Sequence, residues 1–167
     1  MVQPNTKRAL IAATADTGKF SDITSIVHIF SDPVEKDTFK LILIGKLLLK
    51  GELSFKIINF KGRLIYSNKF SAIEFLGDMD DSSSTKQQKV DTFKMRFNHF
   101  FDEKNFSSPA LDPNQPLDSD YVAINIQKDI RSDPKAVGFA YAYGYEGSYV
   151  IAWSKRNKRV VICSASD

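Results

Sequence analysis

The closing stretch of the chain decides the fold and reads, over residues 137–163, VGFAYAYGYEGSYVIAWSKRNKRVVIC. Large side chains alternate with small ones over 137–143, and the alternation resumes over 149–154 after a turn at Gly147. A repeat of two residues is typical of strands that bury one face. A second turn at 155–158 leads into another apolar run. The stretch therefore predicts a three-stranded antiparallel meander.

The first half of the chain also predicts strands. Residues 37–44 form an apolar run that stops at Gly45. The runs 52–59 and 63–67 predict a hairpin, because Gly62 between them tolerates the positive φ that a tight turn needs.

Residues 26–30 allow two interpretations. They alternate and are rich in β-branched residues, yet the apolar residues from Phe20 onward also fit a helical repeat. The β-branched content and the Asp32-Pro33 pair that ends the run favour a strand.

The middle of the chain predicts helices. Ser71 and Glu74 have capping-box spacing, which predicts a short helix, and Ser84 with Gln87 makes a second box. The helix expected beyond the second box carries an apolar stripe as wide as a core-facing side. The stripe consists of Val90, Phe93, Phe97, Phe100 and Phe101.

Two further segments connect this helix to the tail. Three prolines within 107–116 predict a loop, the only candidate for an internal linker. Residues 118–131 predict a third helix, with a strand at 121–126 as the alternative. The inward residues of that helix would be Val122, Ile126 and Ile130.

Strands, then helices, then strands predict an α+β fold. We expect an antiparallel sheet of about six strands with two or three helices packed on one face. The chain has 167 residues, 43% of them apolar and 12% aromatic, which suits one core and a single domain over residues 1–167. Residues 1–6 are expected to be a disordered lead-in.

The composition argues against several classes of function. A net charge of +3 does not by itself indicate a nucleic-acid binder, and no stretch reaches the roughly 18 apolar residues of a transmembrane helix. One cysteine excludes an internal disulfide, and two histidines leave little material for metal or triad chemistry. The acidic turn at 78–82 lacks the glycine and the closing glutamate of a calcium loop. We therefore expect no metal and no cofactor.

One pair of residues could supply a nucleophile and a base, namely Cys163 and His28. A reactive thiolate needs a nearby cation or histidine, and nothing in the sequence brings the two side chains together. A small buried thiol and a half-buried histidine are the better interpretation. We therefore expect no catalytic residue.

An aromatic set in the tail is a candidate for binding a partner. It consists of Tyr141, Tyr143, Tyr149 and Trp153. Tyrosine and tryptophan are favoured at interfaces, although packing in the core is the alternative for these residues.

A basic turn is the second candidate. Lys155, Arg156, Lys158 and Arg159 place four positive charges around one turn. The turn could dock an acidic partner or a phosphate. The alternative is a solvated turn that discourages pairing between sheet edges.

Several segments resemble a known class of proteins. They are Asp133–Tyr141, Glu146–Lys155, Lys158–Ile162, Asp37–Gly45 and Phe55–Phe70. They lie between residues 37 and 162 and resemble small exported proteins of Bacteroidetes-type bacteria, many of them lipoproteins of unassigned function. The resemblance implies the periplasm or cell envelope, with the cytoplasm as the alternative, and it carries over no catalytic residue. The resemblance also implies a membrane tether through an N-terminal lipidated segment, which we expect to be missing from the sequence given.

The sequence thus predicts a non-enzymatic cell-envelope protein that binds a protein partner or a surface component, and no nucleic acid. Two alternatives stay open. One is a small-ligand-binding protein with its site between helices and sheet. The other is a small hydrolase that uses His28 and Cys163.

Overall fold

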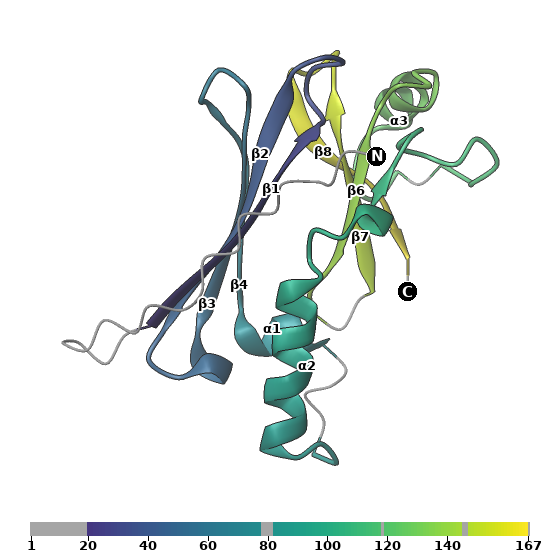
Figure 1. Cartoon of the computed structure of the whole chain (residues 1–167). Helices are drawn as coiled ribbons and strands as arrows, with labels where there is room; N and C mark the ends of the chain where they lie inside the picture. Colours follow the sequence, from purple (N-terminus) through teal and green to yellow (C-terminus); the bar gives the residue numbers. More distant parts are fainter. Residues whose placement is uncertain (1–19, 78–81, 118, 145–146, 167) are drawn as a thin grey trace.

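The computed structural model describes residues 20–77, 82–117, 119–144 and 147–166 (Figure 1). Over these residues the chain forms two four-stranded antiparallel sheets and three α-helices, so the predicted α+β class is confirmed. The expected lead-in at 1–6 lies outside the described residues, as do residues 78–81 of the acidic turn.

Each sheet is a meander whose strands pair in chain order. The first sheet consists of β1 (Phe20–Ile29), β2 (Lys36–Gly45), β3 (Glu52–Ile58) and β4 (Leu64–Ser71). The second sheet consists of β5 (Phe106–Ser107), β6 (Gly138–Ala142), β7 (Ser148–Ser154) and β8 (Arg159–Ser166). The strand interpretation of 26–30, the hairpin turned at Gly62 and the three-stranded tail meander are all confirmed.

The predicted single sheet of about six strands is wrong in its detail. Each meander has one face of large apolar residues, and the two faces are buried against each other rather than joined edge to edge. The eighth strand was missed because β5 has only two residues, too few to show an alternation. It pairs with β6 through Phe106 opposite Phe139.

The core between the sheets is largely aromatic. Phe39 on β2, Phe55 on β3 and Phe139 on β6 are fully buried. The ring of Phe139 lies 5.4 Å from that of Phe39 and 5.4 Å from that of Phe55, measured between centroids, which is the separation that aromatic pairs favour. Both halves of the chain therefore share one core.

The prediction that the helices pack on one face of a sheet is also wrong. Helices α1 (Ala72–Leu76) and α2 (Lys86–Asn98) fill the space between the sheets where these diverge, whereas α3 (Ile124–Arg131) packs on the outward side of the second sheet (Figure 1). The outward side of the second sheet carries small residues such as Gly138 and Ala152, so a helix can lie close to it.

The first predicted helix start is confirmed and the second is one residue off. Ser71 caps α1, and its hydroxyl and the Glu74 carboxylate each accept a backbone N–H. In α2 the capping box is Thr85 with Gln88 instead of Ser84 with Gln87. The sequence fits both boxes, because Ser84 and Thr85 each have a glutamine three residues on.

Parts of the chain between α2 and α3 are buried, although the sequence predicted a longer helix and then a loop there. Helix α2 ends at Asn98, so Phe100 and Phe101 reach the core from the chain beyond it. The proline-rich loop is no linker, because Ala110 and Leu111 are buried in the cluster under α3.

Candidate functional site

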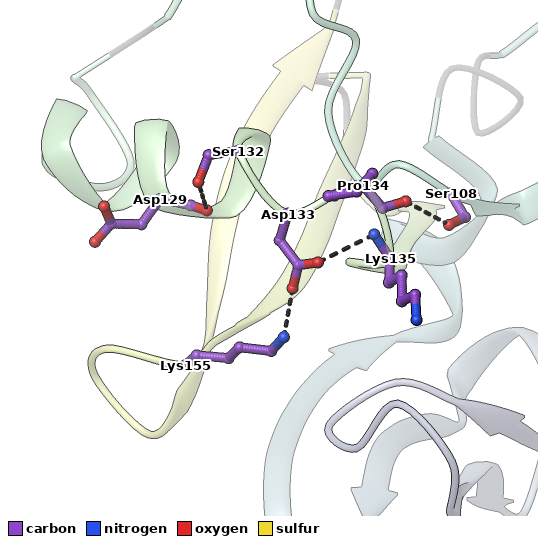
Figure 2. A network of polar contacts seen from close by, with 7 residues as sticks. All are labelled: Ser108, Asp129, Ser132, Asp133, Pro134, Lys135 and Lys155. Atoms are coloured by element: carbon purple, nitrogen blue, oxygen red, sulfur yellow. Dashed lines mark hydrogen bonds and ion pairs between the residues drawn. The ribbon is translucent and has the colours of Figure 1, made fainter.

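Two ion pairs hold the basic turn between β7 and β8 against α3 and the residues just after it, and Figure 2 shows the pair formed by Lys155. Lys155 donates to Asp133 at 2.6 Å, and Arg156 donates to Asp129 at 3.3 Å. The Asp133 carboxylate also accepts the backbone N–H of Lys135 at 3.1 Å. The hydrogen bond from Lys155 lowers the pKa of Asp133. Two of the four cations of the turn are therefore neutralised within the chain.

The other two cations of the basic turn behave differently. Lys158 is exposed and adopts a φ of 53°, the left-handed conformation of a turn, and its N–H donates to Ser154 at 2.8 Å. In the part of the chain that the structure describes, neither Lys158 nor Arg159 forms an ion pair. The cationic surface of the turn is thus half of what the sequence suggests.

The aromatic set of the tail lies mainly in the core. Tyr141 and Tyr149 are buried, and Tyr143 and Trp153 are half-buried. The hydroxyl of Tyr141 forms a 2.5 Å hydrogen bond with the hydroxyl of Tyr66 on the opposite sheet. Burial raises the pKa of both phenols. A partner could reach Tyr141 and Tyr149 only if the sheets separated, so the core interpretation fits these two residues better.

Two hollows adjoin Trp153. One lies against Pro33 in the β1–β2 turn and the other against Ile130 of α3, and both are lined by Asp133 and Lys155. The space that water can enter is about 20 Å³ in the first hollow and about 40 Å³ in the second. Small-molecule sites are usually roughly ten times larger. Neither hollow supports the small-ligand alternative.

The structure does not bring His28 and Cys163 together. The ring of His28, on β1, stacks on Phe106 with 4.0 Å between centroids, and its Nε2 lies 3.4 Å from Glu103. Cys163 is buried beneath α3, where its thiol donates to the carbonyl of Val150 at 3.3 Å. Burial raises the pKa of the thiol to about 12. The Cys–His pair that the hydrolase alternative needs is therefore not formed.

Metal-binding clusters and membrane-spanning helices are two further features to consider in the described residues. The described residues contain no group of three or more histidine, cysteine, aspartate or glutamate side chains placed to hold a metal ion. None of the helices they form is long and apolar enough to cross a membrane.

The sequence reasoning missed the outward side of the first sheet, which we call the open face. Residues directly opposite each other on paired strands share a face. The register pairs Ile23 with Ile42 at one end of this face and Ile58 with Leu64 at the other. Ile23 is 41% exposed, Ile44 53% and Leu64 56%. Exposed apolar residues gathered on one surface are typical of an interaction site.

The open face also carries most of the charge of the first sheet. Its positions include Lys36, Lys40, Lys56 and Lys69, and a single carboxylate, Glu52. Lys69 donates to Glu52 at 2.9 Å, and the other lysines of that face form no ion pair among the residues that the structure describes. The open face is therefore both apolar and cationic.

The outward sides of the two sheets differ in what covers them. On the second sheet, α3 and the 108–123 loop bury Ala152, Val161 and Cys163. No comparable buried cluster forms on the open face among the residues described. A signal was present in the sequence, because the apolar run at 41–44 places isoleucines on the side opposite the leucines, as strands covered on both faces do.

No family model, no curated protein and no solved structure matches the chain. The resemblance to exported bacterial proteins therefore stays a prediction.

Proposed function

We propose that this protein is a non-enzymatic binding protein that engages a protein partner through the open face. The observation that carries the proposal is the exposure of Ile23, Ile44 and Leu64 on a sheet whose other face is fully packed. Apolar area removed from water contributes about 25 cal/mol per Å² to association. A partner that covered this face would gain the same kind of burial that α3 provides on the second sheet.

The cell envelope is the compartment that accompanies this proposal. Its support is the resemblance of the tail and of the segments Asp37–Gly45 and Phe55–Phe70 to exported proteins. Fractionation of the native host, followed by detection of the chain in periplasmic, membrane and cytoplasmic fractions, would test it. Recovery from the cytoplasm alone would contradict the envelope location without affecting the binding proposal.

Site-specific photo-crosslinking tests the open face directly. A benzoylphenylalanine residue would replace Ile44 in one variant and Val34 in another, and both would be produced in the native host. Val34 is the matched control, because it is an apolar residue 75% exposed in the β1–β2 turn, away from the open face. We expect a crosslinked partner from position 44 and none from position 34.

Reconstitution with the purified partner completes the test. Ile44→Glu would place a charge among apolar contacts and is expected to weaken binding at least tenfold, whereas Val34→Glu leaves it unchanged. The double variant Lys158→Glu/Arg159→Glu examines the basic turn in the same assay. If this variant alone lost binding, the turn and not the open face would be the docking surface.

A further inference from the structure

We infer that the open face receives an amphipathic helix of the partner that carries carboxylates between two apolar turns. This inference rests on the proposed function and names the chemistry of the partner. Three independent observations lead to it: an unpaired lysine pair, a buried hydroxyl without a partner, and an internal example of the same kind of contact.

The lysine pair lies in the middle of the open face. Lys40 on β2 is directly opposite Lys56 on β3. Both side chains are half-buried, and neither has an ion-pair or hydrogen-bond partner in the described part of the chain. Like charges directly opposite each other destabilise a sheet. A carboxylate that bound between them would remove the repulsion and form charge-assisted hydrogen bonds.

The hydroxyl of Ser54 lies beside this pair. Ser54 is 8% exposed and is flanked on the neighbouring strands by Ile42 and Lys69. Its Oγ has no hydrogen-bond partner among the described residues. Buried hydroxyls nearly always have one, so this hydroxyl would gain from an acceptor, which could reach it only if the side chains that cover it move aside.

The apolar residues flank the cationic centre along the strands. Ile23 and Ile42 lie on one side of the row of Lys40 and Lys56, and Ile58 and Leu64 lie on the other. The two apolar rows are four residues apart, which is about 13 Å along a strand. At 1.5 Å per residue, a helix covers that distance in about nine residues. Apolar side chains at i and i+8 with a carboxylate at i+4 would therefore match the face.

Helix α3 shows the same type of contact within this molecule. Its Ile126 and Ile130 pack on the outward side of the second sheet. Asp129, on the same helix, pairs with a cation of the β7–β8 turn, Arg156. In this fold, one helix thus already packs its apolar residues on a sheet while an acidic residue of the same helix pairs with a cation beside that sheet.

These observations favour a protein helix over an anionic membrane. Membrane-binding surfaces typically use tryptophan or phenylalanine as anchors, and the apolar positions of the open face hold only isoleucine, valine and leucine.

Two helical peptides would test the inference on the full chain. Both would be 16-residue alanine- and glutamine-based helices with leucines in two turns, i and i+8. One would carry glutamates in the intervening turn and the other lysines. Binding would be followed by fluorescence anisotropy, and the affected residues by amide chemical shifts. We expect the acidic peptide to bind at least tenfold more tightly, with the largest shifts at Lys40, Ser54 and Lys56.

Variants keep the test specific. Lys40→Glu/Lys56→Glu is expected to reverse the preference, so that the basic peptide binds more tightly. The control Lys94→Glu/Lys128→Glu changes the net charge equally at exposed sites on α2 and α3 and should leave the preference intact. Ser54→Ala should weaken the acidic peptide twofold to fivefold without lowering the melting temperature, because the hydroxyl has no partner within the chain.

Several results would overturn the inference. They are equal affinity for the two peptides, no binding of either, chemical shifts that map away from the open face, or binding only to vesicles containing phosphatidylglycerol. Crosslinking from position 44 to a partner segment without acidic residues would overturn it as well, but would leave the proposed function standing.

Discussion

A fully buried carboxylate, that of Asp37, joins two turns at one end of the first sheet. Its Oδ2 accepts the N–H of Ser31 at 2.6 Å, and its Oδ1 accepts the N–H of Phe60 at 3.0 Å. Ser31 belongs to the β1–β2 turn and Phe60 to the β3–β4 turn, so this one side chain fixes both. Replacing Asp37 with alanine would leave two N–H groups without an acceptor.

The expected loss of stability follows from these two bonds. A donor that loses its partner in a buried site costs about 1–3 kcal/mol, and bonds to a charged acceptor lie at the upper end. Both N–H groups are only partly buried, so water would replace some of the loss. We therefore expect Asp37→Ala to lower the free energy of unfolding by about 2–4 kcal/mol. In a chain of this size that corresponds to a melting temperature lower by about 5–15 °C.

Urea unfolding would measure the effect. The single tryptophan, Trp153, reports on the packing between the sheets through its fluorescence, and circular dichroism reports on the strands. The midpoint should fall while the slope stays constant, because the area exposed on unfolding hardly changes. Asp37→Asn retains one acceptor oxygen and should lose about half as much.

A matched control separates this role from a general effect of removing an aspartate. Asp22 also accepts a backbone N–H, that of Ile23 at 2.8 Å, but at an exposed position. Asp22→Ala should change stability by less than about 0.5 kcal/mol. If Asp37→Ala cost no more than Asp22→Ala, the carboxylate would not hold the two turns and the reasoning would be wrong.

Three further predictions concern the core, the pH dependence and the thiol. Tyr141→Phe should cost about 1–2 kcal/mol, because it leaves the Tyr66 hydroxyl unpaired, and the double variant Tyr66→Phe/Tyr141→Phe should cost less than the sum of the single variants in a double-mutant cycle. Folding lowers the pKa of Asp133 below the value of about 3.9 that an aspartate has in an unfolded chain. The carboxylate therefore stabilises the folded protein at pH values above about 3.9, and this stabilisation is lost as the pH falls through the lowered pKa. Lys155→Met should therefore be less stable than the parent chain at pH 7 by less than about 1 kcal/mol, since the pair is partly exposed. The urea midpoints of the two chains should converge once the pH falls below the lowered pKa of Asp133. Cys163, with a pKa of about 12, should react with a disulfide reagent at pH 8 at least about a hundredfold more slowly than free cysteine, and rapid labelling of the folded chain would contradict its burial.

The elements of the fold were accessible to sequence reasoning because they depend on local patterns. The alternation in the tail fixed its three strands, Gly62 marked the first hairpin, and Ser71 with Glu74 marked the start of α1. Where two local patterns fitted equally well, as at Ser84 and Thr85, the sequence did not decide between them.

The candidate sites were less accessible, because exposure depends on how the sheets meet. Tyr141 and Lys155 were candidates for binding a partner, with core packing left open for Tyr141, but the facing sheet buries Tyr141, and Lys155 pairs with Asp133. The open face was missed for the same reason. The apolar run at 41–44 showed that both sides of its strand could be covered, but not that the side with Ile44 faces away from the second sheet.

The sequence by itself determined that the chain forms antiparallel meanders separated by helices, since periodicity and turn residues act over a few neighbours. Tertiary structure decided which faces of those meanders meet. The large aromatic residues of both halves pack against each other, α3 covers the small side of the second sheet, and the side of the first sheet that carries Ile23, Lys40 and Lys56 is left outward. That choice is a balance of apolar area summed over residues far apart in the chain, so no short stretch of the sequence reveals it.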